Sequence, residues 1–351
     1  MSRPSLPALP TLPVVSAVAV PGLPEVADGD DLGALLVAAC AAAGLALADD
    51  DVLVVASKVV AKAEGRSLPA TDRAEAVRSQ TVRVVAERTL PDGRITQVVQ
   101  SRSGPVMAAA GVDASDVAEG TVLLLPADPD ASARALRARV AALAGVRPAV
   151  LVSDTGGRPW RDGVVDFALG AAGLAVLDDA RGRTDRFGRV LEVTVRAVGD
   201  QVAALGDLVK GKAAGTPVAL VRGLGAAVTV EDGPGAAALV RVGPGDWFAH
   251  GHVEAVRAAL GLVAGEVPPA PVVPGGPVAD RAARALAVAR AGRAPDGVQV
   301  GHDGDRLELA GEPYAVGAMA ERLRAALWAE RLDAVVERTA TGAVLTATER
   351  P

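Results

Sequence analysis

The 351-residue chain contains a single cysteine, Cys40, in an alanine-rich run. One cysteine cannot form an intrachain disulfide or a cysteine-based metal cage, so we expect a reducing compartment, the cytoplasm. Aromatic residues make up only 2% of the chain, whereas hydrophobic residues make up 50%. The core must therefore be built mainly from alanine, valine and leucine, which favours helices packed on sheets in an α/β fold.

Two further absences exclude classes of partner. The formal net charge is −6 and the 36 Lys and Arg residues are scattered, so the basic patch of a nucleic-acid-binding protein is missing. No run of 18 apolar residues occurs, and the proline-rich start, residues 1–12, lacks the apolar segment of a secretory signal. We expect a disordered lead at 1–12 and a soluble protein without nucleic-acid or membrane partners.

Continuous apolar runs alternate with helical patterns along most of the chain, which indicates buried strands in a mixed α/β fold. Gly, Pro and Asp residues mark where the expected helices and strands begin and end. The expected strands are 14–20, 52–56, 94–100, 149–153, 190–198 and 217–221, and the expected helices are 31–44, 131–143, 201–208 and 252–262.

One stretch late in the chain has the composition of a linker. Residues 267–278 contain five prolines and a Gly-Gly pair, which predicts a linker over 265–280. We therefore expect one domain at 13–264 and a small C-terminal α+β unit at 281–351, whose role the sequence does not assign. That unit should contain a hairpin around Gly304, a helix at 312–330 and a second hairpin at Thr341-Gly342.

Basic residues follow the second expected strand directly. Lys58 and Lys62 are four positions apart after Ser57, so on a helix both ammonium groups would share one side and could meet a polyphosphate. The segment lacks the glycine-rich approach of a P-loop. On spacing alone, a solvated basic face is the favoured interpretation.

Two carboxylates, Asp113 and Asp116, lie three residues apart after a run of small residues. Hard cations such as Mg²⁺ and Mn²⁺ bind to one or two carboxylates while phosphate oxygens complete their coordination. A turn or a helix cap would use the same residue types for backbone hydrogen bonds. Without other information, the turn or cap is the favoured interpretation.

The most informative stretch follows the expected strand at 149–153. There Asp154 and Thr155 stand where a strand should end, and Gly156-Gly157 would let the backbone approach a ligand. Arg158 and Arg161 add forked donors for phosphate or carboxylate oxygens. Capping of a turn by Asp154 and Thr155 is the alternative, but the concentration of such residues in one loop favours a metal and phosphate site.

A second basic loop, Lys210-Gly211-Lys212 and the residues to Thr216, lies between an expected helix and a strand. Phosphate contact and an ordinary connection are equally compatible with it. The histidines offer no zinc site, because no third ligand of matching spacing accompanies His250 and His252, which are better explained as a helix start.

As a set, these motifs resemble the coenzyme F420-0:gamma-glutamyl ligase family, most closely its actinobacterial form. The resemblance runs in order from about Val14 to Leu262. The segments that carry it are 22–25, 29–32, 57–66, 107–116, 125–133, 153–163 and 207–224.

The resemblance implies a gamma-glutamyl ligase-type fold with mixed sheets and flanking helices. It further implies a ligase that joins L-glutamate to the lactyl-phospho carboxylate of coenzyme F420-0, with GTP as co-substrate and an acyl phosphate as intermediate. Further gamma-linked glutamates could follow. Mg²⁺ or Mn²⁺, with K⁺ as a further candidate, and a homodimer are implied in the same way.

Carried over by position, the resemblance assigns roles to individual residues. Asp113 and Asp154 fall on metal-binding positions that also serve catalysis, Thr155 falls on a metal-binding position, and Arg158 and Arg161 belong to the catalytic loop. The nucleotide-binding positions are Leu23, Pro24, Glu25, Val26, Ser57, Lys62, Asp116, Lys210, Gly211 and Lys212.

Three positions depart from the family pattern. Asp116 replaces the usual Asn, Gln201 replaces the Glu of an Asp-Glu pair, and Ser103 stands where His is common. If these changes disable the site, the chain is instead a catalytically weakened protein that binds the coenzyme or a nucleotide. The last seventy residues are too few for the flavin reductase domain that some actinobacterial relatives carry.

Overall fold

The computed structural model describes residues 14–69, 72–115, 117–211, 215–272 and 275–350. The chain divides into two compact units. The first comprises Met1–Gln80, Ser101–Met107 and Gly111–Arg241, and the second comprises Thr81–Gln100, Ala108–Ala110 and Val242–Pro351. Residues 1–12, expected as a disordered lead, lie outside the described residues, and the expected domain boundaries stay a prediction.

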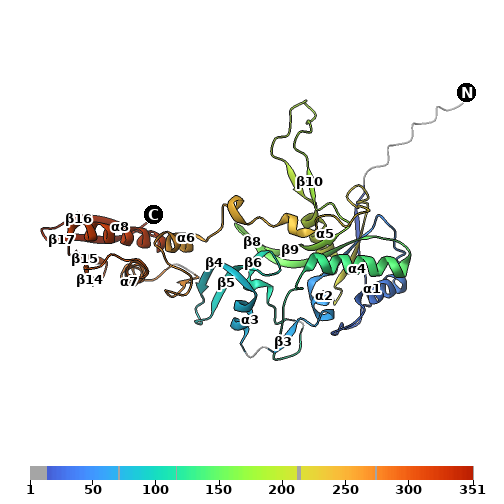
Figure 1. Ribbon diagram of the computed structural model, residues 1–351, viewed down its shortest axis with the longest axis horizontal. Coiled ribbons are helices and arrows are strands. Elements are labelled where there is room, and N and C mark those ends of the chain that lie inside the picture. Colours follow the sequence, from blue (N-terminus) through green and yellow to red (C-terminus); the bar gives the residue numbers. More distant parts are fainter. Residues whose placement is uncertain (1–13, 70–71, 116, 212–214, 273–274, 351) are drawn as a thin grey trace, which may run out of the picture. The chain divides into compact units, whose positions relative to one another are not determined.

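A five-stranded mixed sheet forms the centre of the first unit, in the order β1-β12-β2-β8-β9. β2 and β8 run parallel, and the other neighbouring strands are antiparallel. The expected mixed α/β architecture is thereby confirmed (Figure 1). The strands are β1 (Ser16–Ala19), β12 (Val218–Arg222), β2 (Val52–Ala56), β8 (Ala149–Arg158) and β9 (Arg161–Ala172).

Both faces of the central strands of this sheet are buried. Leu53 and Val55 of β2 join the apolar cluster on the face covered by α1 (Leu32–Ala42) and α4 (Pro129–Ala144). Val52 and Val54 join the cluster on the face covered by α5 (Val198–Lys210). Alternate side chains of a strand point to opposite faces, so a strand buried on both faces must be apolar throughout.

Helix α4 approaches strand β9 closely on the face of the sheet that α1 and α4 cover. Gly170 of β9 faces the start of α4, and a Cβ atom on it would lie 2.1 Å from the carbonyl oxygen of Pro129. Asp128 caps the helix there by accepting a hydrogen bond from the backbone N–H of Ala131. The helix can pack against this strand only because position 170 has no side chain.

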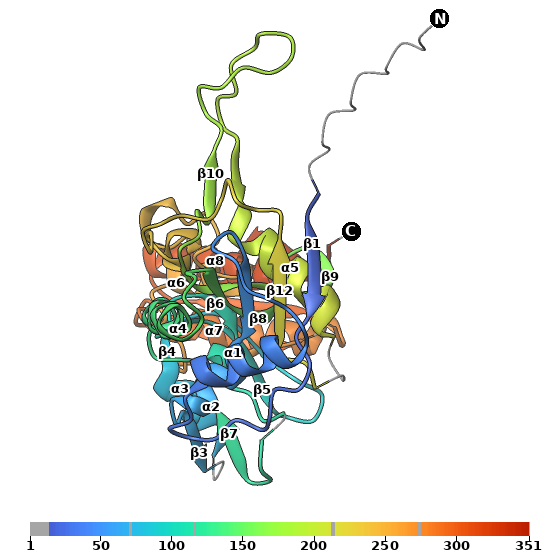
Figure 2. The same cartoon turned by 90° about the vertical axis from the view of Figure 1, so that its right-hand side faces the viewer.

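Shorter elements complete the first unit. They are α2 (Ser57–Ala63), β3 (Ser67–Pro69), α3 (Arg73–Gln80), β6 (Val106–Ala108), β7 (Thr121–Leu123), β10 (Leu177–Asp179) and β11 (Val195–Ala197). β10 and β11 form the base of a long arm that projects from this unit (Figure 2). The strand expected at 190–198 is therefore shortened to β11.

The second unit contains the C-terminal sheet, in the order β14-β15-β17-β16, packed on α7 and α8 around a core that includes Leu323, Leu327 and Leu345. Both expected hairpins and the expected helix at 312–330 are confirmed, but α7 and β4 were not predicted. No helix in the described parts of the chain is long and apolar enough to cross a membrane. The elements of this unit are β4 (Thr81–Thr89), β5 (Ile95–Ser101), α6 (His252–Ala259), β13 (Ala270–Pro271), α7 (Val278–Arg290), β14 (Gln299–Asp303), β15 (Arg306–Ala310), α8 (Pro313–Ala329), β16 (Leu332–Arg338) and β17 (Gly342–Glu349).

One expectation was wrong in a way that matters for the site. The strand predicted to end at Ser153 continues to Arg158, and the expected loop is an antiparallel hairpin of β8 with β9. Gly156-Gly157 has little intrinsic preference for a strand, but it pairs with Val165 and Val164 of β9. The ladder of the partner strand overrides the local signal for a loop.

Candidate functional site

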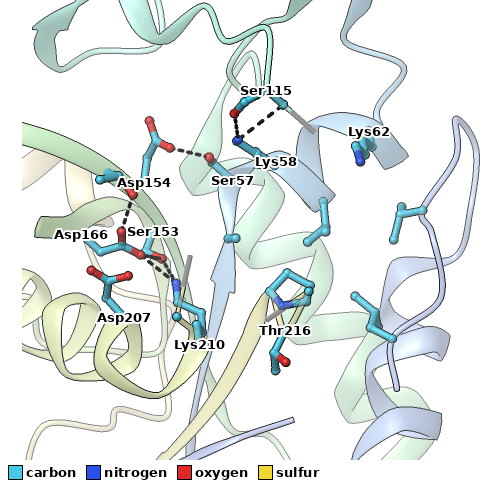
Figure 3. A pocket seen from close by; sticks show the side chains of 18 of the residues that line it. Ser57, Lys58, Lys62, Ser115, Ser153, Asp154, Asp166, Asp207, Lys210 and Thr216 are labelled. Carbon is cyan, nitrogen blue, oxygen red and sulfur yellow. Dashed lines mark hydrogen bonds and ion pairs between the residues drawn. The ribbon is translucent and has the colours of Figure 1, made fainter. Parts of the chain in front are cut away.

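A cavity of about 580 Å³ opens where β2 and β8 leave their parallel pairing. This is the edge at which open α/β sheets place ligands, because neighbouring parallel strands end there together. The cavity contains many of the residues selected from the sequence (Figure 3). Of those selected, the lining includes Leu23, Pro24, Glu25, Val26, Ser57, Lys62, Asp154, Thr155, Lys210 and Gly211.

Helix α2 begins immediately after β2 and delivers two ammonium groups to this cavity. Lys62 Nζ lies 2.7 Å from Glu25 Oε1, and the side chain of Lys62 is only 10% exposed. Lys58 Nζ lies 2.8 Å from Asp113 Oδ2 and donates to Ser115 Oγ at 2.6 Å. Lys62 is therefore not part of a solvated face, whereas the side chain of Lys58 is still 30% exposed. Contact of either lysine with phosphate stays a prediction.

Asp113 reaches the site through Lys58 and Ser115, which both line the cavity. Its Oδ1 also accepts the backbone N–H of Ser115 at 2.8 Å. The turn-forming alternative is therefore correct as far as it goes, but the same carboxylate also pairs with a lysine. Burial opposes ionisation, yet the bonds from Lys58 and Ser115 leave the pKa of Asp113 below its usual value.

Asp154 lies within β8 and caps no turn, so the capping alternative is wrong for it. Ser57 Oγ donates to Asp154 Oδ1 at 2.8 Å, which joins β8 to the start of α2. Burial above all, opposed by the bond from Ser57 and assisted by the charges of Asp166 and Asp113, raises the pKa of Asp154 to about 6. A carboxylate in such a place is stabilised in its ionised form by a cation.

A buried network that the sequence did not predict supports the hairpin. Thr155 Oγ1 donates to Asp166 Oδ1 at 2.6 Å, and Ser153 Oγ donates to Asp166 Oδ2 at 3.0 Å. Lys210 Nζ lies 2.8 Å from Asp166 Oδ2 and donates to Ser153 Oγ at 2.7 Å, with the two charged side chains 3% and 4% exposed. The sequence did contain one sign of this network. Asp166 interrupts the apolar run 164–169, and a charge buried in such a run needs a partner of opposite charge.

The donor set suits a hard divalent cation. Asp113 and Asp154 offer carboxylates whose charges influence one another, and Thr155 offers a hydroxyl oxygen. Across the described ranges, no group of three or more His, Cys, Asp or Glu side chains could hold a metal by itself. Two carboxylates and a hydroxyl instead match Mg²⁺ or Mn²⁺, which complete their coordination with phosphate oxygens and water.

Of the described residues selected from the sequence, three are not among those lining this cavity: Asp113, which reaches it through Lys58 and Ser115, Arg158 and Arg161. Arg158 lines a neighbouring cavity on the same hairpin, and Arg161 is exposed on β9. Asp116 and Lys212 lie outside the described residues. Of the three departures from the family pattern, Ser103 donates its hydroxyl to the carbonyl oxygen of Pro126 at 2.8 Å, so the substituted side chain has a structural partner.

Comparison with known proteins shows which family the sequence matches. The model of the family F420-0:Gamma-glutamyl ligase matches residues 22–223. The protein called coenzyme F420:L-glutamate ligase from Methanopyrus kandleri is 42% identical over 218 residues, 57% of this chain and 83% of that protein. Proteins of the same name are 41% identical in Archaeoglobus fulgidus and 42% in Haloarcula marismortui, over 59% and 57% of this chain and 86% and 84% of theirs.

The fold, the cavity and these similarities define the chain as an enzyme of the ligase class. It belongs to the F420-0:gamma-glutamyl ligase family, as the sequence motifs indicated. Residues 224–351, which include most of the second unit, lie outside the part matched by the family model.

Proposed function

We propose that this chain uses GTP to form an amide between the amino group of L-glutamate and the lactyl-phospho carboxylate of coenzyme F420-0. The observation that carries the proposal is a single cavity in which two lysines, Lys58 and Lys62, lie near carboxylates suited to a divalent cation. Its relatives named for joining L-glutamate to coenzyme F420 support the identity of the substrates.

The reaction must overcome repulsion between a carboxylate and a triphosphate. In the proposed first step, a carboxylate oxygen of F420-0 attacks the γ-phosphorus of GTP and GDP leaves. The ammonium groups of Lys58 and Lys62 stabilise the phosphate charge during this step. In the second step the glutamate amine attacks the acyl carbon, phosphate leaves with its bonding electrons, and the nitrogen loses a proton to give the amide.

The remaining side chains hold the reactants in line. Asp113, Asp154 and Thr155 would hold Mg²⁺ or Mn²⁺, which when bound neutralises phosphate charge and orients the transferred group. Ser57 fixes the orientation of Asp154 through its hydrogen bond of 2.8 Å. Leu23 to Val26 and the Lys210 to Gly211 turn form the remaining walls for the nucleotide.

The proposal includes the finer expectations from the sequence: a cytoplasmic homodimer, K⁺ as a further cation, and addition of further gamma-linked glutamates. It also includes the division into a ligase domain at 13–264, a linker at 265–280 and a C-terminal unit at 281–351. Parts of that linker are ordered, since β13 pairs with Arg88 and Thr89 of β4.

Turnover tests the proposal directly. The full chain is incubated with F420-0, L-glutamate, GTP and MnCl₂ or MgCl₂, and the product is followed by mass spectrometry together with GDP release. We expect a mass increase equal to glutamate minus water and one GDP per amide. Absence of product with either metal, with or without KCl, would refute the proposal. Product formation with ATP in place of GTP would correct the nucleotide alone.

A further inference from the structure

A second cavity, of about 380 Å³, lies beside the first on the β8–β9 hairpin. Its walls are largely apolar and include Val106 and Met107 on β6, Phe167 on β9 and Leu239. Pockets of this size with apolar walls and a few polar groups are typical of small-molecule sites. The metal and nucleotide roles proposed for the first cavity leave this second cavity without an assigned ligand.

The two cavities are joined by consecutive residues of one strand. Ser153 to Thr155 line the first cavity, Gly156 to Arg158 line the second, and Asp166 lines both. Along an extended strand, Thr155 and Arg158 are separated by about 10 Å. A molecule of modest length in the second cavity can therefore extend one end to Asp154 and Thr155.

Arg158 makes the second cavity attractive to an anion. Its Nε is buried and has no hydrogen-bond partner within the described chain, while its Nη2 lies 3.5 Å from the carbonyl oxygen of Asp162. A buried guanidinium N–H without a partner is unfavourable, and a phosphodiester or carboxylate oxygen would satisfy it. The negative charge of Asp166, which lines both cavities, is already balanced by its ion pair with Lys210.

We propose that this second cavity binds the acceptor, F420-0. The apolar walls would contact its planar deazaflavin portion, and Arg158 would bind the phosphodiester that precedes the reacting carboxylate. Asp200, which lines the cavity and accepts the N–H of Ala168 at 3.0 Å, suits N–H groups at the edge of such a ring. This inference rests on the proposed function, because it assigns the binding site of that reaction's acceptor.

Gly157 provides a way to fill the cavity selectively. A Cβ atom on Gly157 would meet no atom within 4 Å, and its backbone is not in the left-handed region. Gly157→Val should therefore occupy the space of the ligand without straining the hairpin. Gly301→Val on β14 is the matched control, because a Cβ there makes only an ordinary contact of 3.7 Å with Glu308 and lies in the second unit.

The experiment measures two quantities for the full-length wild type, Gly157→Val, Arg158→Met, Arg158→Lys and Gly301→Val. Equilibrium dialysis gives F420-0 binding, and initial rates give KM for F420-0, GTP and glutamate. We expect Gly157→Val and Arg158→Met to weaken F420-0 binding and raise its KM by about tenfold or more, with KM for GTP changed less than about twofold. Arg158→Lys should recover part of the loss, and Gly301→Val should match the wild type.

Three outcomes would overturn the assignment. Unchanged F420-0 binding in both Gly157→Val and Arg158→Met, with an active wild type, would remove the acceptor from this cavity and leave the proposed function intact. An equal rise in KM for GTP would make the cavity part of the nucleotide site. A wild type that forms no amide would instead refute the proposed function, whatever the binding results show. Circular dichroism of each variant separates unfolding from loss of binding.

Discussion

The hydroxyl of Thr155 donates a hydrogen bond of 2.6 Å to the carboxylate of Asp166. The other oxygen of that carboxylate lies 2.8 Å from the ammonium of Lys210. A hydroxyl that gives its proton to a carboxylate keeps oxygen lone pairs for accepting contacts, which is what a metal ligand supplies. Asp166 thus orients the hydroxyl of Thr155. Lys210 compensates the charge of Asp166, which allows that carboxylate to be buried.

The first prediction concerns this buried pair. Asp166→Asn leaves the ammonium of Lys210, 3% exposed, without its charge partner. We expect the free energy of unfolding, measured by urea denaturation, to fall by roughly 3–5 kcal/mol, as when one member of a buried ion pair is removed.

The double variant Asp166→Asn/Lys210→Met provides the control for that measurement. Removal of both charges should restore a large part of the lost stability, because no unpaired ion remains buried. A single variant that loses less than about 1 kcal/mol would show that the pair is well hydrated and does not organise the hairpin.

The second prediction concerns Asp154, whose pKa burial raises to about 6. Holding this group ionised near pH 7 destabilises the metal-free fold, so Asp154→Asn should stabilise it by on the order of 1–2 kcal/mol and raise its Tm by a few degrees. The same change should lower turnover by at least about a hundredfold, or 2.7 kcal/mol. Scanning calorimetry in EDTA and initial rates measure the two effects.

A gain in stability together with a loss of turnover distinguishes a functional carboxylate from a structural one. Asp154→Asn that destabilises the metal-free protein would mean that the carboxylate stabilises the fold. Near-normal turnover would contradict its assignment as a metal ligand. Thr155→Val, which removes a hydroxyl and not a charge, should lower turnover without the gain in Tm.

The third prediction concerns nucleotide binding by Lys62, whose ammonium lies at the cavity with its side chain 10% exposed. Lys62→Met removes a charge-assisted contact to phosphate while keeping much of the apolar stem, so KM for GTP should rise by about tenfold or more. KM for glutamate should change little. Steady-state kinetics with each substrate varied in turn provides the measurement.

Arg139→Met is the matched control for Lys62. It removes one positive charge from an exposed ion pair with Asp31, and neither residue is among those lining the cavity. Its KM for GTP should stay within about twofold of the wild type, because exposed pairs contribute little and are screened. An equal effect of both substitutions would indicate that overall charge, not Lys62, governs GTP affinity.

The fourth prediction tests the packing that positions the sheet. Gly170→Ala places a methyl group 2.1 Å from the carbonyl oxygen of Pro129. The helix or the strand must shift, and we expect a loss of about 1–3 kcal/mol in the free energy of unfolding. Gly301→Ala, with an ordinary contact of 3.7 Å, should change stability little. Urea denaturation of both variants compares them, and equal stabilities would contradict the close approach.

Local patterns in the sequence predicted many elements of the fold. The apolar run of β2 (Val52–Ala56) was located to the residue, and Asp31 caps α1 where a helix start was expected. Lys58 and Lys62 share a helix, as their spacing indicated. These features depend on neighbouring residues alone, since strand burial, capping and helical spacing are local properties.

The hairpin of β8 and β9 could not be predicted in this way. Gly156 and Gly157 signal a loop, and only pairing with Val165 and Val164 extends the strand through them. Asp166 was overlooked for the same reason, because the partners that explain its burial, Ser153 and Lys210, are distant in sequence. Long-range pairing determines both features, and no local propensity encodes it.

The sequence by itself determined the family, the mixed α/β class and the candidate nucleotide and metal residues, because ordered motifs and apolar periodicity are written along the chain. Only the tertiary structure decided how those residues are grouped. It placed Lys62 and Asp154 at one cavity and Arg158 at another, and it joined Thr155 to Lys210 through Asp166. The physical reason is that charges and hydroxyls act over a few ångströms, so their chemistry depends on which distant segments the packed sheet brings together.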